Sequence, residues 1–287
     1  MSPPRPTLLL SVDFEDWHQL IRRRVGASNW REPGPALARE TEALLDLFER
    51  LDVRATFFVL GMAARAHPQL VKPIVDRGHE IGCHGDAHLP VHTQTPAEFT
   101  ADLRAARATI EELTGKTPVG YRAPAFSITR AADWAYDVLA QEGFAYDSSQ
   151  HDSPAIRDRT VPARRAPHRL ETGLWEFPVA VWRVRSARIP VGGASYWQLL
   201  PTRVLLRGLR NAGSVAGLYL HPYELDPEPL RAMLPADATA TQHAHAKLRE
   251  TQRNGARRRA PGALEAIARR FDLIPYGEAH ARLGDGA

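Results

Sequence analysis

The sequence has 287 residues, of which 44% are hydrophobic and 24% charged, the ordinary composition of a globular protein. It contains no run of about 18 apolar residues, so membrane insertion is not expected. The N-terminal stretch "MSPPRPTLLLSVDFED" has too short an apolar segment for a secretory signal. The single cysteine, Cys83, excludes an intramolecular disulfide, and together these features favour a cytoplasmic location.

The net charge is only +4, but arginines cluster at 22–24, 157–169 and 257–259. Such clusters can attract an anionic polymer, yet they are more often solvated loops and helix faces. No nucleic-acid-binding motif with aromatic stacking residues accompanies them, so no nucleic-acid partner is expected. A G-x-S-x-G elbow, a dinucleotide fingerprint and a P-loop are also absent, which disfavours serine hydrolases and nucleotide-binding enzymes.

Short apolar strands alternate with amphipathic helical stretches along the chain. The apolar patterns predict strands at 7–13, 54–60, 79–84, 119–124, 144–149 and 215–221. Helical spacing, capping residues and terminal glycines predict helices at 35–52, 67–78, 95–115, 129–143 and 201–211. This alternation is typical of parallel strands joined by crossover helices, and it predicts an α/β barrel or a doubly wound sheet.

Residues 150–198 break the alternation with Pro-, Arg- and Gly-rich segments and short strands such as "LWEFPVAVWRV". The pattern returns afterwards, and no internal repeat or domain boundary is visible. We therefore expect one domain over residues 1–287, with an irregular insertion at about 150–198 that covers one end of the barrel.

Reactive side chains fall at the C-terminal ends of four predicted strands: Asp13, His84, Arg122 and His221. In parallel α/β folds this rim carries the active site, because the strand ends converge there. An arginine in such a rim needs an anionic partner, and Asp13 is the obvious one for Arg122. A near-neutral imidazole such as that of His221 suits a general acid.

The stretch "HGDAH" places His84 and His88 four residues apart, where they can share a metal if the strand gives way to a helical turn. The acids of "SVDFEDW" could supply a carboxylate ligand, and a His/His/carboxylate set leaves coordination open for water. The sequence leaves open whether Glu15 or Asp16 is that ligand. Five aromatic side chains near these motifs could stack on sugar rings or pack in the core: Trp17, Trp182, Tyr196, Trp197 and Tyr223.

In this order the motifs resemble those of the polysaccharide deacetylases of carbohydrate esterase family four, most closely the branch that accompanies bacterial exopolysaccharide gene clusters. The family's acidic motif is similar to "SVDFEDW", its H-[ST]-x-x-H motif to "HGDAH", its R-x-P motif to "RAP" and its L-x-H motif to "YLH". With secondary similarities such as "ATFFVLG" and "LHPYELDP", the resemblance spans residues 8 to 228.

The resemblance implies a distorted (β/α) barrel of the polysaccharide deacetylase type and metal-dependent removal of N-acetyl groups from a glycan. It implies that Asp13 is the general base, that Arg122 orients it, and that His221 is the general acid. His84, His88 and one carboxylate would hold a divalent metal, with Zn²⁺ expected and Co²⁺ or another divalent ion as the alternative. The implied partner is an acetylated polysaccharide or oligosaccharide.

The chain departs from the family pattern at three places. The acidic pair is spread into "DFED", Gly85 replaces the Ser or Thr of the histidine motif, and Tyr219 replaces the leucine of the last motif. The usual acidic partner of the terminal histidine is not found, and Asp147 is the expected stand-in. Two alternatives therefore stay open: an amidohydrolase acting on a small cyclic amide or ureide, and a catalytically silent glycan-binding relative.

Overall fold

A computed structural model describes residues 5–152, 164–255 and 257–284. The strands of its main sheet follow the order β10-β1-β2-β3-β4-β5-β7-β6, and β11 also pairs with β1. Their bounds are β1 (Thr7–Phe14), β2 (Thr56–Val59), β3 (Glu80–Cys83), β4 (Gly120–Tyr121), β5 (Tyr146–Asp147), β6 (His168–Arg169), β7 (Trp175–Glu176), β10 (Ala216–Leu220) and β11 (Asp272–Ile274).

All pairs of the main sheet are parallel except β6 with β7. Strand β1 pairs with β10 along 8–12, with β11 along 7–9 and with β2 along 11–14. Within the described residues the end strands β10 and β6 do not pair with each other, and isolated parallel bridges join Val179 to Gly217 and Gly193 to Tyr219 on the outer side of β10. The parallel order places the C-terminal ends of β10, β1, β2, β3 and β4 side by side.

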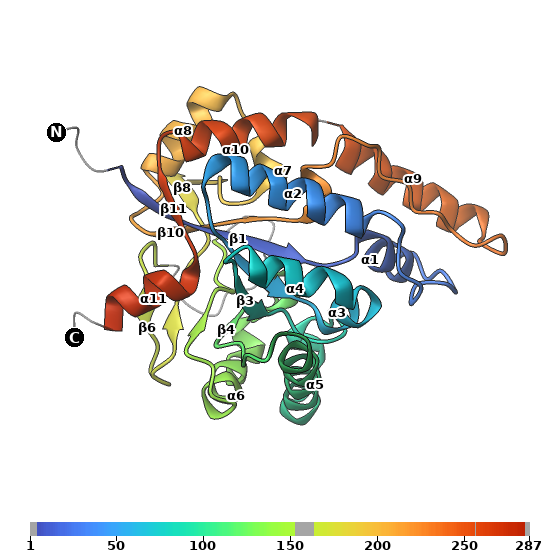
Figure 1. Ribbon diagram of the computed structural model, residues 1–287, viewed down its shortest axis with the longest axis horizontal. Coiled ribbons are helices and arrows are strands. Elements are labelled where there is room, and N and C mark those ends of the chain that lie inside the picture. Colours follow the sequence, from blue (N-terminus) through green and yellow to red (C-terminus); the bar gives the residue numbers. More distant parts are fainter. Residues whose placement is uncertain (1–4, 153–163, 256, 285–287) are drawn as a thin grey trace.

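Helices line the outside of this sheet (Figure 1). Their bounds are α1 (Trp17–Arg24), α2 (Leu37–Leu51), α3 (Gly61–Ala66), α4 (Pro68–Asp76), α5 (Pro96–Thr114), α6 (Trp134–Gln141), α7 (Ala194–Trp197), α8 (Thr202–Arg210), α9 (Ala240–Asn254), α10 (Ala260–Ala268) and α11 (Tyr276–Gly284). Short 3₁₀ turns occur at Val91–Thr93, Pro124–Phe126, Arg130–Ala132, Pro222–Glu224 and Arg257–Arg259. None of the helices in the described residues has the length and apolar character needed to cross a membrane.

Helix α5 shows how local sequence sets these elements. The Thr95 hydroxyl accepts the backbone N–H of Glu98, and the Glu98 carboxylate accepts the N–H of Thr95, which forms a capping box. Gly115 ends the helix with a φ of 67°, a left-handed conformation that glycine adopts at little cost. The helix start and end predicted from these residues are confirmed.

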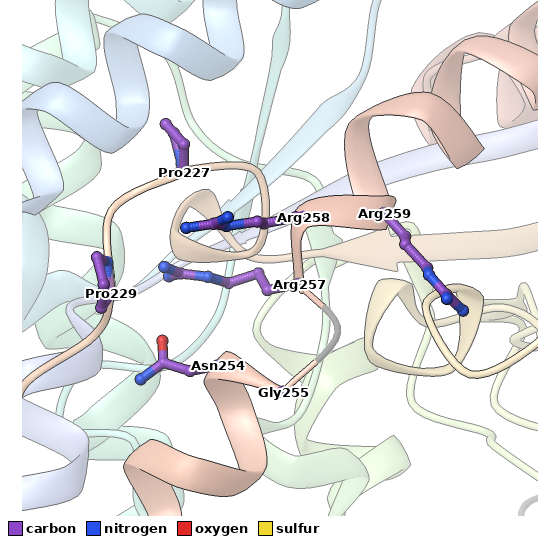
Figure 2. A pocket seen from close by; sticks show the side chains of 7 residues that line it. All are labelled: Pro227, Pro229, Asn254, Gly255, Arg257, Arg258 and Arg259. Carbon is purple, nitrogen blue, oxygen red and sulfur yellow. The ribbon is translucent and has the colours of Figure 1, made fainter.

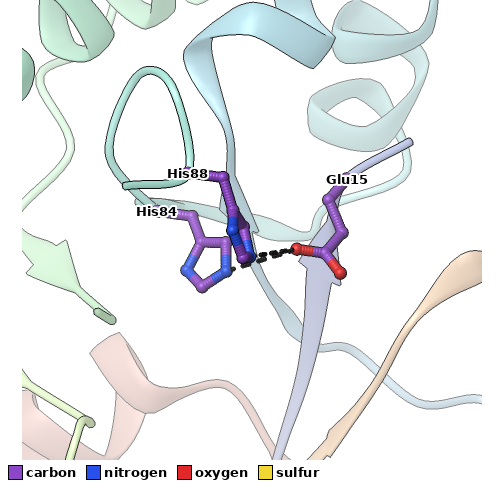
Figure 3. A group of neighbouring side chains, drawn as sticks. All are labelled: Glu15, His84 and His88. Atoms are coloured by element: carbon purple, nitrogen blue, oxygen red, sulfur yellow. Dashed lines mark ion pairs between the residues drawn. The ribbon is translucent and has the colours of Figure 1, made fainter. Parts of the chain in front are cut away.

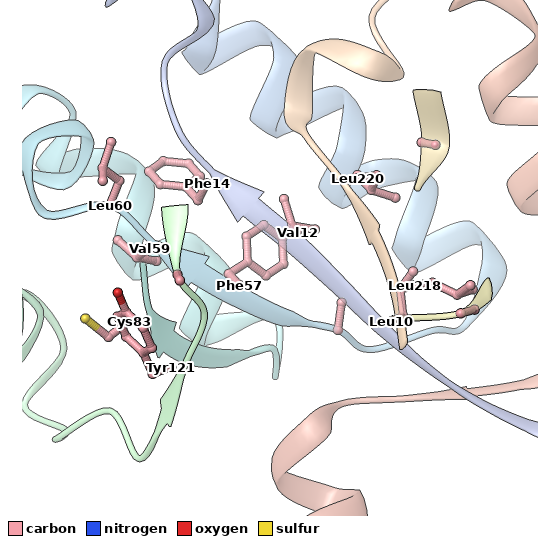
Figure 4. Packing of buried hydrophobic residues seen from close by; sticks show 14 of the residues in the cluster. Leu10, Val12, Phe14, Phe57, Val59, Leu60, Cys83, Tyr121, Leu218 and Leu220 are labelled. Carbon is pink, nitrogen blue, oxygen red and sulfur yellow. The ribbon is translucent and has the colours of Figure 1, made fainter. Parts of the chain in front are cut away.

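Alternation along β1 separates the core from the site. Leu8, Leu10, Val12 and Phe14 point into the main hydrophobic cluster between the sheet and its helices (Figure 4). Leu9 points to the other face, where it packs with aromatic side chains inside the barrel. Ser11 and Asp13 follow on that inner face, and both are buried. The alternation of side chains along β1 therefore places Ser11 and Asp13 at the barrel mouth, while the apolar residues of the strand pack in the core.

The region expected to be an irregular insertion contains ordered elements among its described residues. Strands β7 and β6 extend the main sheet beyond β5. Strands β8 (Val181–Val184) and β9 (Ala187–Pro190) form a separate antiparallel hairpin. Further along, α9 lies on the same side of the molecule as α1, which it contacts (Figure 1).

Candidate active site

Four polar side chains meet at the C-terminal rim of the sheet, as the strand pattern predicts. Asp13 is the second-last residue of β1, His84 follows β3, Arg122 follows β4 and His221 follows β10. The side chains of all four are largely buried, and that of His221, at 13%, is the most exposed. Buried groups of this kind are stable only when they are paired or bind a ligand.

Arg122 is completely buried and holds Asp13 in place. Its Nη1 donates to Asp13 Oδ1 at 2.8 Å and to the Ser11 hydroxyl at 2.6 Å. Its Nη2 donates to the hydroxyls of Ser148 at 2.8 Å and Tyr276 at 2.9 Å, and its Nε to the Ser148 carbonyl at 3.1 Å. Burial alone would lower the pKa of Arg122, but Asp13 raises it above its ordinary value. Every guanidinium nitrogen is thus occupied, and one Asp13 oxygen is fixed.

Glu15, His84 and His88 converge on one point (Figure 3). One ligand atom from each lies within 4.8 Å of the others. Glu15 Oε2 is 3.0 Å from His88 Nε2 and 3.6 Å from His84 Nε2. Burial would raise the pKa of Glu15, but His88 and His221 hold it well below its ordinary value, so the carboxylate is ionised.

The hydrogen bonds around this group fit a bound cation. His84 Nδ1 lies 2.8 Å from the carbonyl oxygen of Arg122, and because a carbonyl only accepts, Nδ1 carries the proton. His84 Nε2 therefore turns a lone pair toward Glu15. Glu15 Oε2 is buried, and apart from the facing nitrogens of His84 and His88 it has no hydrogen-bond partner among the described residues. Two facing acceptors with an orphaned oxygen are the arrangement that a divalent metal satisfies.

A loop, rather than the helical turn expected from the four-residue spacing, brings the two histidines together. Gly85 has a φ of 76° and His88 a φ of 52°, both left-handed. The Asp102 carboxylate accepts the N–H groups of Asp86 at 2.8 Å and Ala87 at 3.1 Å. A Cβ on residue 85 would lie 2.7 Å from Asp102 Oδ2, so glycine permits this approach.

Arg23 of α1 holds the other end of the same loop. Its guanidinium donates to the carbonyl of Ala87 and, at 2.6 Å, to that of His88. The position of the His88 ring thus depends on a helix that follows the acidic motif.

Asp16 does not belong to the metal-ligating group. Its carboxylate caps α1, accepting the N–H of His18 at 2.8 Å and that of Gly34. It also lies 3.3 Å from His18 Nδ1 and 3.6 Å from His67 Nε2. Burial would raise the pKa of Asp16, but these histidines and the Gly34 amide lower it. Of the two carboxylates that the sequence leaves open, the structure brings Glu15 to the histidines.

His221 is paired with Glu224 and not with Asp147. His221 Nδ1 lies 3.0 Å from Glu224 Oε2, and its Nε2 lies 3.3 Å from Glu15 Oε1. Asp147 instead accepts from the Ser149 hydroxyl at 2.7 Å, so the expected role for it is wrong. Burial would lower the pKa of His221, but Glu15 and Glu224 raise it to about 9. The sequence feature that could have identified Glu224 as the partner of His221 is its position three residues after the histidine in "HPYELD". There it caps a 3₁₀ turn.

Two protein-family models match parts of this chain. Residues 32–144 match the polysaccharide deacetylase model, and residues 148–271 match a domain of unknown function, DUF3473. The peptidoglycan deacetylase of Helicobacter pylori is 35% identical over 106 residues, 37% of this chain and 35% of that protein. Residues 32–144 are thus similar to the polysaccharide deacetylase family.

A second relative is also similar over part of its length. The peptidoglycan-N-acetylglucosamine deacetylase PgdA of Listeria monocytogenes is 32% identical over 93 residues, 32% of this chain and 20% of that protein. The chain thus matches about a third or less of the length of these deacetylases.

Solved structures show the fold. A Mycobacterium smegmatis protein provisionally assigned as a polysaccharide deacetylase superposes with a TM-score of 0.64 at 20% identity, covering 100% of this chain and 93% of that chain. A mutant of a CE4 family pseudoenzyme, with restored enzymatic activity, gives 0.51 at 14% identity, covering 97% and 69%. The predicted distorted α/β barrel is confirmed, in the form of a half-barrel.

The reactive groups of the candidate site line one pocket of about 580 Å³ that opens to solvent. Asp13, Glu15, His84, His88 and His221 all contribute to its wall. Both family segments are needed to build it, because His221 comes from the DUF3473 segment and the two metal-site histidines from the deacetylase segment.

Two of the five aromatic side chains named as candidate sugar-stacking groups, Trp17 and Tyr223, also line the pocket. Tyr223 stacks on the His221 ring at a centroid distance of 4.9 Å. Trp182, Tyr196 and Trp197 do not line it, and the Trp197 indole is buried and donates to the carbonyl of Val191.

A second hollow, of about 450 Å³, lies by the arginines at 257–259 (Figure 2). Arg257 is buried and donates to the carbonyls of Tyr223 and Glu228. Arg258 and Arg259 are exposed. This arginine cluster therefore contains one structural residue and two solvated ones, and it carries no catalytic group.

Proposed function

We propose that this chain is a metal-dependent hydrolase that removes N-acetyl groups from an acetamido-sugar glycan, a polysaccharide or oligosaccharide deacetylase. The observation that carries the proposal is the convergence of Glu15, His84 and His88 in one pocket with Asp13 and His221. The similarity of residues 32–144 to polysaccharide deacetylases supports the reaction class, and the pocket's opening to solvent suits a glycan chain better than a small cyclic amide.

In this proposal Glu15, His84 and His88 hold a divalent metal, expected to be Zn²⁺. When bound, such an ion polarises the acetyl carbonyl and makes water more acidic. The proposal for Asp13 is that it takes the proton of the attacking water, while Arg122 fixes the direction of its carboxylate. His221 gives a proton to the departing amine, and a backbone N–H helps hold the oxyanion. Water and the amide thus become acetate and a free amino sugar.

Several finer assignments belong to this proposal. They are the identity of the acetyl-bearing sugar, Zn²⁺ as the native ion, and one catalytic domain spanning residues 1–287. The exopolysaccharide-associated branch and a cytoplasmic location stay predictions from the sequence.

Acetate release from N-acetylglucosamine oligomers tests the proposal, with metal-stripped protein and with protein restored by Zn²⁺ or Co²⁺. We expect release only in the restored samples and loss of release in His84→Ala. His245→Ala, at an exposed position of α9, is the matched control and keeps full activity. A silent glycan-binding relative would release no acetate from any acetylated sugar while still binding metal, and that result would contradict the proposal.

A further inference from the structure

The pocket that contains the metal-site histidines is also lined by arginines. Arg24 comes from α1, and Arg249 and Arg253 come from α9; all three line the pocket, and we refer to them as the arginine wall. A fourth lining arginine, Arg23, is occupied by the carbonyls of the histidine loop. The wall is thus formed where a helix after the acidic motif meets a helix of the DUF3473 segment.

No carboxylate of the described residues forms an ion pair with the arginine wall. Arg249 donates to the Gln252 amide oxygen at 3.0 Å, and Arg253 to the Ser195 hydroxyl at 2.7 Å. The Gln252 amide is neutral, but the Ser195 hydroxyl in turn donates to the Glu224 carboxylate, and Tyr223, Glu224 and Glu15 raise the pKa of Arg253. Elsewhere on the surface arginines are commonly paired, as Arg104 is with Glu142 at 2.8 Å.

The guanidinium group of Arg24 lies close enough to Arg249 and Arg253 to be repelled by them. Burial, followed by the charges of Arg249 and Arg253, lowers the pKa of Arg24. Like charges gathered at one wall cost free energy unless an anion offsets them. A negatively charged ligand bound to the arginine wall would offset this repulsion.

The acidic groups of the pocket act on Arg253, but among the described residues they form no ion pair with Arg24 or Arg249. Of the residues that line it, only Asp13 and Glu15 are carboxylates. Asp13 is bound by Arg122, and Glu15 faces three histidines. The excess positive charge is thus left for a ligand that enters from solvent.

We infer that the substrate is an anionic glycan, and that the arginine wall binds an oxyanion group which the glycan carries near the acetamido sugar. The inference rests on the proposed function and names the substrate class of the same site. Guanidinium groups bind carboxylate and phosphate oxygens through paired hydrogen bonds, so a uronic acid and a phosphate ester share the required chemistry. Trp17 and Tyr223 in the same pocket offer apolar faces to the sugar ring.

The test compares three sets of acetylated oligomers of equal length with the full chain loaded with Zn²⁺. One set is neutral N-acetylglucosamine, one alternates N-acetylglucosamine with glucuronate, and one carries phosphate esters. We expect kcat/KM to be about tenfold or more higher for at least one charged set, because hydrogen bonds to charged groups are worth more than neutral ones. The charged set that is preferred identifies the source of the oxyanion.

The double variant Arg24→Gln, Arg249→Gln should lower the ratio of charged to neutral kcat/KM by about tenfold, mainly through KM. Arg258→Gln, at an exposed position outside the pocket, is the matched control and should leave the ratio unchanged. Equal kcat/KM on neutral and charged oligomers, or an equal loss on both in the double variant, would overturn the inference.

Calorimetric titration separates this inference from the proposed function. If the wild-type protein releases no acetate from any oligomer, the proposed function fails. Binding of a charged oligomer that the double variant weakens about tenfold would still support the arginine wall. The absence of binding, or binding that the double variant leaves unchanged, would overturn it.

Discussion

His84 donates its Nδ1 hydrogen to the carbonyl oxygen of Arg122 across 2.8 Å, and this bond joins the two halves of the candidate site. The side chain of Arg122 fixes Asp13, and its backbone fixes the tautomer and the ring of His84. One residue after β4 therefore positions both the proposed base and a proposed metal ligand. Such supporting hydrogen bonds commonly decide the orientation of metal-binding histidines.

Asp13→Asn tests the proposed base. The variant keeps the side-chain volume but leaves the Arg122 charge buried without its counter-charge. We expect kcat to fall by about 10²- to 10⁴-fold and the free energy of unfolding to fall by about 3–5 kcal/mol. Metal stoichiometry should stay the same, since Asp13 is not in the metal-ligating group.

Glu142→Gln is the control for the Asp13 prediction, because it breaks an exposed pair with Arg104 and should cost at most about 1 kcal/mol. Denaturant unfolding and steady-state kinetics measure both effects. Undiminished kcat in Asp13→Asn would remove Asp13 from the mechanism.

Glu224→Gln tests the positioning of His221. The Glu224 carboxylate lies 3.0 Å from His221 Nδ1 and also accepts the His221 backbone N–H at 3.0 Å. Without its charge, we expect kcat to fall by about 10²-fold or more with little change in KM, since the proposed acid acts in the chemical step. Asp147→Asn, the carboxylate that the sequence favoured, should leave kcat far less affected; the opposite order would contradict the assignment.

Gly85→Ala tests the histidine loop, and Gly115→Ala is its matched control. Both glycines have left-handed φ values, 76° and 67°, so each substitution should cost about 1–2 kcal/mol of stability. At Gly85 the new Cβ would also meet Asp102 Oδ2 at 2.7 Å, whereas nothing lies within 4 Å at Gly115.

We therefore expect about 10- to 100-fold weaker metal binding in Gly85→Ala and unchanged binding in Gly115→Ala, measured by competition with a chromophoric chelator. Equal metal affinities in the two variants would show that Asp102 does not set the loop.

His79 should make stability depend on pH. The N–H of Ala55 donates to His79 Nδ1 at 3.3 Å, which requires the unprotonated ring. Burial and then the charges of Arg77 and Arg54 lower the pKa of His79 to about 4. Because this is below the value of about 6.5 in the unfolded chain, the contribution is complete above that pH and is lost as the pH falls toward 4.

His79→Gln should reduce the loss of unfolding free energy between pH 6.5 and 4.5 by up to about 1.4 kcal/mol per pH unit. His92→Gln, at an exposed position, is the comparison and should follow the wild-type curve. A His79→Gln curve parallel to the wild type would show that His79 does not titrate in this way.

Much of the fold follows from local patterns. The apolar run of β1 and the capped, periodic sequence of α5 were predicted close to their observed bounds, because each has strong local signals. The strands after 119 and 144 were predicted too long, since β4 and β5 each pair over only two residues. Their ends are set by neighbouring strands, which a single-sequence pattern does not contain.

The candidate site was predicted in part for a similar reason. Strand ends of parallel neighbours meet, so Asp13, His84, Arg122 and His221 could be grouped from sequence. Choosing between Glu15 and Asp16 required the direction in which the chain leaves β1, because Asp16 turns to cap α1. The arginine wall depends on the contact of α1 with α9, more than 200 residues apart, which no local pattern reveals.

Metal stoichiometry in Glu15→Gln and Asp16→Asn tests the central claim most directly. Equilibrium dialysis of the two variants and the wild type against Zn²⁺ would measure it, with circular dichroism to confirm folding. We predict one tightly bound ion in the wild type and in Asp16→Asn, and at least about 100-fold weaker binding in Glu15→Gln. Retained binding in Glu15→Gln with loss in Asp16→Asn, or no binding in the wild type, would contradict the account.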